Sequence, residues 1–465
     1  MEEIELSKIH PAPYNPRILS DEAFRTLRDS IRDLGVIKPI LVNAGNHVIV
    51  AGHQRTKTML AMEITKAPCY LLRGLSEEDE IRFNQIHNQC EYEINDRAPK
   101  VRIVGTLALG YNRVANNRIV LTDAGSLNTY GNILGKMITK FGEFCAPVSD
   151  EQGNIIISAG YARAAKLLGL DLDIFVIPNE KKELALHYFS RDYGQFCYDN
   201  LPKKTYHQTF AQMFRLRGGK KENNSTLYVQ RVFPFLKAQP GEGKSLRILD
   251  FGAGQYDFAK ALERQGYNIT YVDPYHRCER SSKLIDYKGN RKGFLKICDD
   301  LLEHGLYDVV ICDSVLNSVD SVEAERSVID SVFGLCKPQG TIFISGRLFE
   351  KSAINDKTRG CSISYMDSQL KFFDKNGFTG LFRNGNWFYQ RLHKKAELPF
   401  IGRRLSTAAR IYTPGMVWHI VAKKDIERSE EEIIRGLRFE FNLPLPRNKR
   451  YDLQDRIEQA YRGRK

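Results

Sequence analysis

Two glycines after a short apolar run place the strongest constraint on how this chain can fold. The residues Arg247 to Phe251 lead into Gly252-Ala253-Gly254, and the apolar residues Phe258 and Leu262 follow at helical spacing. This order predicts a buried strand, a tight turn and a helix whose N-terminus faces a ligand, because glycine lets a backbone approach a ligand closely. Many nucleotide-type sites share such a turn, so the following residues must supply the rest of the site.

The residues after the turn alternate between predicted strands and helices. Further strands are expected at 267–272, 294–297, 307–312 and 341–345, and several of them are nearly continuous apolar runs. Strands buried on both faces and separated by helices are typical of a parallel, doubly wound sheet. The fold class predicted for residues 246–425 is therefore α/β, with a Rossmann-like sheet.

Acidic residues follow three of these expected strands. Asp273 ends the second strand, Asp299 and Asp300 end the third, and Asp313 follows the fourth. A carboxylate at the end of the second strand can accept hydrogen bonds from both hydroxyls of a ribose. The pattern therefore predicts a nucleotide-like ligand at the carboxyl edge of the sheet.

The motifs L-D-F-G-x-G, Y-V-D, D-V-V-x-x-x-x-V-L and L-x-K-P-x-G-T-I-F-I-S occur in that order. Together they resemble the class I S-adenosylmethionine-dependent methyltransferases. The resemblance implies that Asp250 orders the glycine turn and the methionine end of the cofactor. It also implies that Gly252 and Gly254 pass close to the cofactor and that Asp273 holds its ribose.

The same resemblance places Asp299 near the adenine amino group, with Asp300 as the competing choice. It places Asp313 and Asn317 where the sulfonium of the cofactor meets the methyl acceptor, as candidate catalytic residues. The alternative for Asp313 or Asn317 is a helix N-cap. A nicotinamide dehydrogenase would need a third glycine near Asp257, which the sequence lacks.

The methyl acceptor is not identified by a motif. DNA enzymes that methylate amino groups carry an Asp/Asn/Ser-Pro-Pro-aromatic motif after the fourth strand, whereas residues 313–316 read Asp-Ser-Val-Leu. Asp273-Pro274-Tyr275 follows the second strand and has one proline, and Cys312 lacks the preceding proline of a cytosine-C5 enzyme. Transfer to an oxygen, an amine or an already modified base stays open.

The first 95 residues carry a second set of motifs. P-x-x-x-N-P-R precedes a capped helix, G-V-I-x-P-I-x-V precedes a second strand, and G-H-x-R opens a further helix. This order resembles the N-terminal domain of the ParB/sulfiredoxin superfamily, an α+β module. The resemblance implies a site for a nucleoside triphosphate with Mg²⁺ at Gly52, His53 and Arg55, with Asn88 from a second motif. That second motif, at 84–89, departs from the family's E-N-x-Q-R pattern, which puts hydrolysis in doubt.

The alternative for His53 and Arg55 is that they only cap and solvate a helix. A glycine turn and an arginine at a helix N-terminus nevertheless suit a phosphate, because the helix dipole and the guanidinium both favour an anion.

Residues 96–200 resemble residues 1–95 when the sequence is shifted by 108 positions. They are predicted to form a degenerate second ParB-like module. His53 becomes Tyr161 in the second copy, so we expect the first copy to keep any ligand chemistry and the second to be structural or a pairing surface, with a homodimer through these modules. The matching pairs are Pro39 and Pro147, Gly45-Asn46 and Gly153-Asn154, Ala51-Gly52 and Ala159-Gly160, Arg55 and Arg163, and Leu60 and Leu168.

Residues 201–245 form a predicted basic connector, with Lys203-Lys204 and the run 215–221 either solvated or in contact with a phosphate backbone. The stretch Gly241 to Ser245 imitates a phosphate-binding P-loop. It fails as one because Ala238 stands where the first glycine is needed, and because the stretch precedes a strand instead of following it.

The net charge of +13 and the isoelectric point of about 9.2 favour a polyanionic partner, most simply DNA. Between Lys371 and Lys424, eleven Lys and Arg residues face two acids, and both tryptophans fall in this segment. Interleaved basic and aromatic residues suit a nucleic-acid track, and the alternative is that they are the last strands of the sheet. The candidate contacts are Arg383, Trp387, Arg391, Lys394, Lys395, Arg403, Arg404 and Trp418.

The chain lacks an apolar leader, a run of about 18 apolar residues and a Cys/His cluster at zinc spacing, so we expect a soluble cytoplasmic protein with reduced cysteines and no metal site. Residues 426–465 are predicted to be helical. The expected function is methylation of DNA or of a DNA-associated target, as in phage or mobile-element DNA-modification proteins. Two rivals stay open: a DNA- or nucleotide-binding protein with a non-catalytic methyltransferase fold, and a small-molecule methyltransferase.

Overall fold

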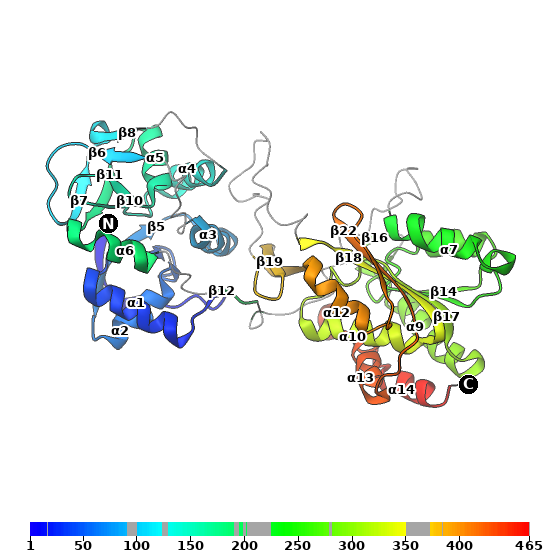
Figure 1. The fold of residues 1–465 in the computed structure, drawn as a ribbon. Coiled ribbons are helices and arrows are strands. Elements are labelled where there is room, and N and C mark those ends of the chain that lie inside the picture. The colour runs from blue at the N-terminus through cyan, green and yellow to red at the C-terminus, as the bar shows by residue number, and fades with distance from the viewer. Residues whose placement is uncertain are drawn as a thin grey trace. The chain divides into compact units, whose positions relative to one another are not determined.

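The computed structural model divides into two compact units (Figure 1). The first contains the described residues up to Leu201, and the second contains most of the described residues from Ser225 onward. The structure describes residues 1–15, 17–90, 100–122, 129–189, 195–198, 201, 225–278, 281–349, 373–383 and 385–464.

The first unit begins with a four-stranded sheet in the order β1-β5-β3-β4. Strand β1 is antiparallel to β5, β5 is parallel to β3, and β3 is antiparallel to β4. The apolar faces of the helices pack on this sheet, and Leu27, Ile31, Ile40 and Met59 meet in one buried cluster. The elements are β1 (Glu2–Glu5), α1 (Asp21–Leu34), β3 (Ile40–Asn43), β4 (Ile49–Ala51), α2 (His53–Ala61), β5 (Lys66–Leu72) and α3 (Glu77–Cys90).

The chain then builds a second sheet with the same topology, in the order β7-β11-β9-β10. The pairings are again antiparallel, parallel and antiparallel. This shared topology agrees with the predicted repeat, and a small β6–β8 ribbon is added to the second copy. The elements are β6 (Val101–Ile103), β7 (Gly110–Val114), β8 (Ile119–Leu121), α4 (Thr129–Phe141), β9 (Val148–Ser149), β10 (Ile155–Ile157), α5 (Ala159–Leu167), β11 (Leu172–Val176) and α6 (Lys182–Phe189).

The two modules pack on each other reciprocally. Helix α1 of the first contacts α6 of the second, where the Tyr188 hydroxyl donates to Asp33 Oδ2 at 2.6 Å. Helix α3 of the first contacts α4 of the second, where the rings of Phe83 and Phe141 lie 5.7 Å apart. Because α1 corresponds to α4 and α3 to α6, the two contacts are matched, as they are in a two-fold dimer. This matched packing is what the predicted duplication would produce.

The second unit is organised around a six-stranded sheet in the order β14-β13-β17-β18-β22-β21. The first four strands are parallel, β22 is antiparallel to β18, and β21 is antiparallel to β22. The predicted Rossmann-like class is confirmed. The strands are β13 (Ile248–Phe251), β14 (Ile269–Val272), β17 (Tyr307–Cys312), β18 (Cys336–Arg347), β21 (Arg410–Tyr412) and β22 (Val417–Lys423).

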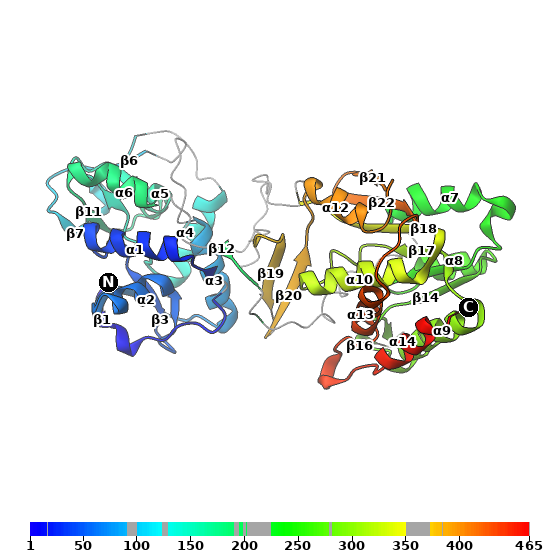
Figure 2. The same ribbon diagram turned by 60° about the horizontal axis from the view of Figure 1, so that its bottom comes forward.

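Helices and short ribbons surround this sheet (Figure 2). A π-type turn at Tyr228–Val232 runs into α7 and precedes the first strand of the sheet. The remaining elements are α7 (Phe233–Lys237), α8 (Asp257–Arg264), β15 (Arg277–Cys278), β16 (Ser281–Ile285), α9 (Tyr287–His304), α10 (Val322–Leu335), β19 (Phe378–Arg383), β20 (Asn386–Arg391), α12 (Leu398–Arg403), α13 (Glu430–Glu440) and α14 (Gln454–Arg462).

The strand predicted at 294–297 is wrong, because these residues lie inside helix α9. Phe294, Ile297, Cys298 and Leu301 are buried at helical spacing along one face of α9. A short apolar run does not by itself distinguish a strand from a buried helix segment. The six-stranded sheet ends at β14, with no third parallel strand beyond it among the described residues.

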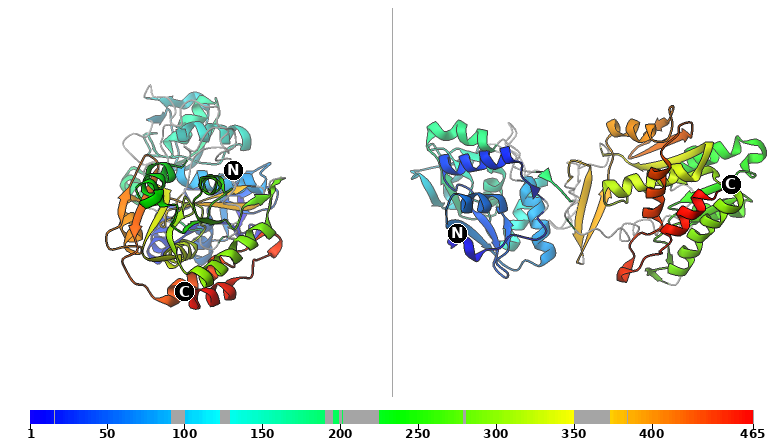
Figure 3. Two further views of the ribbon diagram at one scale, coloured as in Figure 1. Left: turned by 90° about the vertical axis from the view of Figure 1, so that its right-hand side faces the viewer. Right: turned by 90° about the horizontal axis from the view of Figure 1, so that it is seen from below.

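Two helices, α13 and α14, occupy the predicted helical end of the chain and belong to the same unit as the sheet. Helix α13 packs on α10 and α14 packs on α9 (Figure 3). The first contact is close, because a Cβ added at Gly334 of α10 would overlap Ile433 Cγ2 of α13. Across the described part of the chain, no helix has the length and apolar character needed to cross a membrane.

We expect Gly334→Ala to destabilise the second unit by about 1–3 kcal/mol, because the added methyl forces α10 and α13 apart. Both tryptophans of the chain lie in β20 and β22 of this unit, so tryptophan fluorescence during urea unfolding reports the loss as a lower midpoint. Gly293→Ala in α9 is the control, since its Cβ would meet Val272 Cγ2 at an ordinary 3.5 Å. Equal midpoints for the two variants would contradict close α10–α13 packing.

Candidate functional site

Three acidic residues converge at the carboxyl edge of the parallel strands. Asp250 lies near the end of β13, Asp273 follows β14, and Asp313 follows β17. Because β13 pairs in parallel with both β14 and β17, the ends of the three strands are neighbours. All three side chains are buried, although carboxylates are seldom fully buried without hydrogen-bond partners. The partners of each acid therefore define the site.

The glycine turn after β13 is shaped by close contacts. Gly252 and Gly254 have φ angles of 83° and 61°, in the left-handed region that favours glycine. A Cβ added at Gly252 would overlap Val315 Cγ2, so the loop after β17 lies directly against the turn. The Gly254 N–H donates to Asp273 Oδ2 at 2.9 Å and ties the turn to the second acid.

Asp273 accepts a second backbone hydrogen bond at Oδ1, from the Tyr275 N–H at 2.7 Å. Burial raises the pKa of Asp273 to about 6, although the N–H groups of Tyr275 and Gly254 and the charge of Arg277 act in the opposite direction. At neutral pH the carboxylate is ionised. It can then accept hydrogen bonds from ribose hydroxyls, as the sequence predicts.

Asp250 is held by a residue that sequence reasoning missed. The Tyr228 hydroxyl donates to Asp250 Oδ2 at 2.5 Å, and the Tyr228 ring stacks on Phe258 with centroids 4.5 Å apart. A small pocket lined by Tyr228, Asp250, the glycine turn and Asp313 opens here. Tyr228 lies in the predicted connector 201–245. The signal that could have found it is the helical spacing of Tyr228 and the buried Val232.

Asp313 is tied to the end of β18. Its Oδ1 accepts hydrogen bonds from Ser345 Oγ at 2.6 Å and from Ser314 Oγ at 3.1 Å. Asn317 lies in the same loop, and within the described part of the protein its Oδ1 is buried without a hydrogen-bond partner. The N-cap of α10 is Ser321, so the alternative in which Asp313 or Asn317 caps that helix is wrong.

Asp299 and Asp300 do not lie at this edge. Asp299 is exposed on α9 and forms an ion pair with Arg456 at 3.0 Å. Asp300 Oδ2 accepts hydrogen bonds from Thr270 Oγ1 at 2.9 Å and from the Tyr307 hydroxyl at 2.8 Å, near the beginning of β14 and β17. Their predicted role at the adenine is therefore a wrong assignment, because it depended on the strand that the structure replaces with a helix.

Two side chains beside the glycine turn of the first module form hydrogen bonds to backbone groups of the same module. Gly52, with a φ of 105°, precedes α2. His53 Nε2 accepts a hydrogen bond from the Ala12 N–H at 3.0 Å, and burial lowers the pKa of His53 to about 4, so the ring is neutral. Arg55 Nη1 donates to the Lys38 carbonyl at 2.8 Å. The Asn88 side chain lies outside the described part of the structure.

The second module contributes to this turn, which sequence reasoning did not anticipate. The buried Lys38 Nζ donates to Ser158 Oγ at 2.6 Å, and Ser158 stands directly before α5 as Gly52 stands before α2. The two equivalent turns are therefore linked through Arg55, Lys38 and Ser158.

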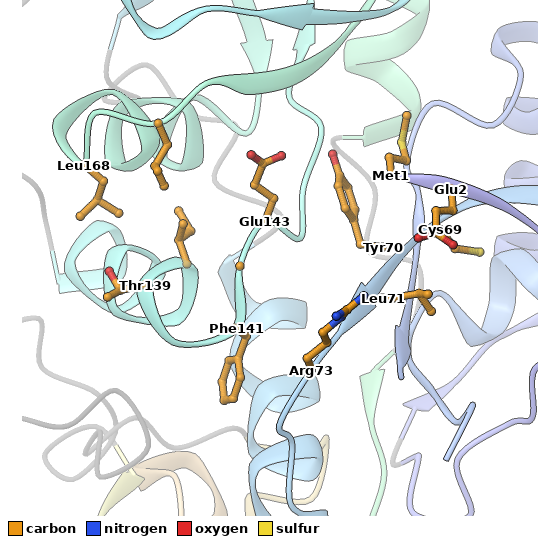
Figure 4. Close-up of a pocket in the computed structure, with 13 residues that line it drawn as sticks. Met1, Glu2, Cys69, Tyr70, Leu71, Arg73, Thr139, Phe141, Glu143 and Leu168 are labelled. Atoms are coloured by element: carbon orange, nitrogen blue, oxygen red, sulfur yellow. The ribbon is translucent and has the colours of Figure 1, made fainter. Parts of the chain in front are cut away.

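A larger hollow of about 720 Å³ lies between the two modules (Figure 4). Tyr70 and Arg73 line it from the first module, and Phe141, Glu143 and Leu168 line it from the second. The Tyr70 hydroxyl donates to Asp173, and Glu143 pairs with Arg113, so these two polar groups already have partners within the first unit.

The predicted nucleic-acid track is wrong at three positions, Trp387, Arg391 and Trp418. Trp418 is fully buried in β22 and Trp387 is buried in β20. Arg391 is buried between Glu325 at 2.8 Å and Glu397 at 2.7 Å, which supply its ion pairs. Strand β20 alternates and turns Trp387 and Arg391 into the protein, whereas β22 lies between β18 and β21 and is buried along most of its length.

Of the other predicted contacts, one is paired with an acid, three are exposed, and one has a side chain outside the described residues. Arg404 forms an ion pair with Asp330 at 2.7 Å, whereas Lys394, Lys395 and Arg403 are exposed. The Arg383 side chain lies outside the described part of the structure, as do the basic residues at 203–204 and 215–221. A continuous track is therefore not formed by the described residues, and three exposed cations remain.

Comparison with known families identifies two regions. Residues 1–89 match the ParB N-terminal domain, and residues 221–385 match the methyltransferase domain family. Both predicted resemblances are confirmed. The ParB match covers the first module only, so the duplication stays a prediction supported by the shared topology.

Individual proteins are similar to parts of the chain. The ubiquinone biosynthesis O-methyltransferase of Rickettsia felis is 34% identical over 102 residues, 22% of this chain and 41% of that protein. The ParB-like nuclease domain-containing protein YnaK of Escherichia coli is 30% identical over 77 residues, 17% of this chain and 87% of that protein. The chain thus spans less than half the length of the ubiquinone methyltransferase. A putative S-adenosylmethionine-dependent methyltransferase structure from Listeria monocytogenes has 13% identity and a TM-score of 0.26, and the match covers 39% of this chain and 90% of that one.

We expect the affinity for S-adenosylmethionine to fall as the pH drops below about 6. The pKa of Asp273 is raised to about 6, and a protonated carboxyl offers the ribose fewer acceptor sites than the carboxylate. Calorimetric titration between pH 5 and pH 8 measures this change, with circular dichroism to confirm folding at each pH.

Asp273→Asn is expected to weaken binding by about ten- to a hundredfold and to remove the pH dependence. The control is Asp299→Asn on the exposed face of α9. It should leave the cofactor affinity and the pH dependence of that affinity unchanged. Wild-type affinity that stays constant from pH 5 to pH 8 would contradict the assigned role of Asp273.

Proposed function

We propose that this protein, which belongs to the ParB N-terminal domain family and joins that domain to an S-adenosylmethionine-dependent methyltransferase domain, methylates DNA or a DNA-associated target. The convergence of Asp250, Asp273 and Asp313 at one edge of the parallel sheet carries the methyl-transfer part of this proposal. Ligands of open α/β sheets bind at this edge.

The residues at the edge fit the cofactor. The glycine turn lines a small pocket together with Asp250 and Asp313, and Asp273 is a buried carboxylate bound to the turn. Asp250, oriented by Tyr228, lies on the side where the resemblance places the methionine end. When bound, S-adenosylmethionine supplies an electrophilic methyl group on a sulfonium.

The loop after β17 is the proposed methyl-acceptor side. Asp313 is fixed by Ser345 and faces the pocket that the glycine turn also lines. A carboxylate fixed in this way can orient an acceptor or take its proton, a contribution of about 10²–10⁴ in rate. The unsatisfied Oδ1 of Asn317 can accept a hydrogen bond from an acceptor N–H or O–H.

A target on DNA is supported by the ParB domain, by the net charge of +13 and by the exposed cations Lys394, Lys395 and Arg403. In this proposal the ParB-like modules supply recognition, and the methyltransferase domain supplies the chemistry. The matched faces of the two modules contact each other, so a homodimer would use a different surface of the first unit.

A small-molecule acceptor is the second candidate. The similarity to a ubiquinone biosynthesis O-methyltransferase favours it, as does the burial of both tryptophans of the predicted nucleic-acid track. The two candidates differ in their response to salt, because contacts with DNA phosphates weaken steeply as the salt concentration rises.

Incubation with methyl-labelled S-adenosylmethionine and separate pools of DNA, RNA, protein and small metabolites tests the proposal. We expect label in DNA or in a protein bound to DNA, with a yield that falls between 50 and 200 mM salt. Salt-insensitive label in the metabolite pool would establish the second candidate. Cofactor binding without label in any pool would overturn the enzymatic proposal.

Variants of the acceptor loop test the residues. Asp313→Ala and Asn317→Ala should each lower methyl transfer, Asp313→Ala by about 10²-fold or more, while cofactor affinity is kept. Asp299→Asn, remote from the site, should transfer at the wild-type rate. Unchanged transfer by Asp313→Ala would exclude it from the chemistry.

We also infer that the first module binds a nucleoside triphosphate with Mg²⁺ at Gly52, His53 and Arg55. The arginine at a glycine turn before a helix supports this inference, and Arg55 would exchange the Lys38 carbonyl for phosphate oxygens. Arg55→Ala should abolish binding of a labelled nucleotide, whereas Arg163→Ala in the second copy should retain it if the variant folds. If Arg163→Ala abolished nucleotide binding while Arg55→Ala retained it, the nucleotide site would belong to the second copy and not to the first.

A further inference from the structure

The loop that carries Asp273 lacks the sheet neighbour that the sequence predicts. The sheet ends at β14, and the residues expected to form the next strand lie in α9. Residues 273–276 are alternately buried and partly buried, and their backbone carbonyls need partners, because an unpaired buried carbonyl costs about 1–3 kcal/mol. The His276 carbonyl has one in the Asp286 N–H at 2.9 Å. The C-terminal segment supplies one of these partners.

Tyr451 reaches this loop from the segment between α13 and α14. Its side chain is fully buried, and its hydroxyl donates to the carbonyl of Pro274 at 2.6 Å. Pro274 directly follows Asp273. Its carbonyl belongs to the Pro274–Tyr275 peptide, whose N–H donates to Asp273 Oδ1 at 2.7 Å, so this hydrogen bond fixes a peptide that binds the carboxylate proposed to hold the ribose.

The Tyr451 ring is itself held by helix α9. It stacks on Tyr287 with centroids 5.3 Å apart and lies at the same distance from Phe294. Arg291 Nε donates to the Tyr451 carbonyl at 3.3 Å, and the Tyr287 hydroxyl donates to the Arg450 carbonyl at 3.1 Å. The segment is thus fastened on both sides of Tyr451.

A second buried residue of α9 completes the support. Asn290 Nδ2 donates to the His276 carbonyl at 3.1 Å, and its Oδ1 accepts from the Tyr256 hydroxyl at 3.3 Å. The Tyr256 oxygen also accepts from the Asp273 N–H at 3.3 Å. Tyr256 follows the glycine turn, so the same network joins the turn, the Asp273 loop and α9.

We propose that the C-terminal segment from Leu443 to Leu453 takes the place of the missing third strand, and that Tyr451 is a positioning residue for the adenosine end of the cofactor. Tyr451 acts through the Pro274 carbonyl, which sets the direction of the Asp273 carboxylate. This inference rests on the proposed S-adenosylmethionine-dependent function, and it adds a residue that is 177 positions away in the sequence from the loop it holds.

Tyr451→Phe removes the hydroxyl and keeps the ring that packs between Tyr287 and Phe294. We expect the dissociation constant for S-adenosylmethionine, and for S-adenosylhomocysteine as a second probe, to rise about five- to tenfold. The rate of methyl transfer at saturating cofactor should stay within about twofold of the wild-type rate, because the acceptor loop is untouched.

Tyr287→Phe is the matched control. It removes a hydroxyl from the neighbouring ring, but that hydroxyl contacts the Arg450 carbonyl instead of the Asp273 loop. We expect unchanged cofactor affinity. Melting temperatures of both variants separate a loss of affinity from a loss of stability.

A double-mutant cycle with Asp273→Asn tests the coupling directly. If Tyr451 acts through Asp273, Tyr451→Phe should raise the dissociation constant fivefold to tenfold in the wild-type background. In the Asp273→Asn background the same substitution should change it little. A full penalty in both backgrounds would overturn the positioning role.

The same titrations separate the two proposals. Failure of the wild-type protein to bind either S-adenosylmethionine or S-adenosylhomocysteine would overturn the proposed function and this inference with it. Wild-type binding with an unchanged affinity in Tyr451→Phe would overturn the inference alone. Equal losses in Tyr451→Phe and Tyr287→Phe would also overturn it, because general packing would then explain both.

Discussion

The buried carboxylates at the carboxyl edge of the parallel sheet are the constraint on which the second unit depends. A charge removed from water needs hydrogen bonds, and each acid here obtains them from a different part of the chain. Asp250 uses Tyr228 from before the sheet, Asp273 uses the glycine turn, and Asp313 uses Ser345 at the end of β18. The site is therefore assembled only when all these elements are in place.

This requirement explains why α9 and the C-terminal helices are part of the methyltransferase unit. Without a third strand beyond β14, the Asp273 loop is supported by Asn290 of α9 and by Tyr451. The segment that carries Tyr451 lies between α13, which docks on α10, and α14, which docks on α9. Close packing at Gly334 therefore helps to place Tyr451 beside the loop of Asp273, the residue proposed to hold the ribose.

Local patterns predicted the parts of the site that are local in the sequence. The glycine turn and the acids after β13, β14 and β17 follow their strands directly, so motif order was enough to find them. Tyr228 and Tyr451 were missed because their partners lie 22 and 177 residues away. The strand predicted at 294–297 was wrong because a short apolar run fits a strand and a buried helix segment equally well. Trp418 was misplaced because composition does not show that β22 is buried along most of its length.

The first unit depends on a comparable coupling. Arg55 is held by the Lys38 carbonyl, and the Lys38 ammonium is held by Ser158 of the second copy. In the proposed nucleotide complex, Arg55 would form a charge-assisted hydrogen bond to phosphate, which is stronger than its bond to the neutral Lys38 carbonyl. In the second copy Tyr161 takes the place of His53, and Ser158 in the left-handed conformation directly precedes α5. The Ser158 hydroxyl binds the Lys38 ammonium, so the second copy supplies a contact that joins the two turns.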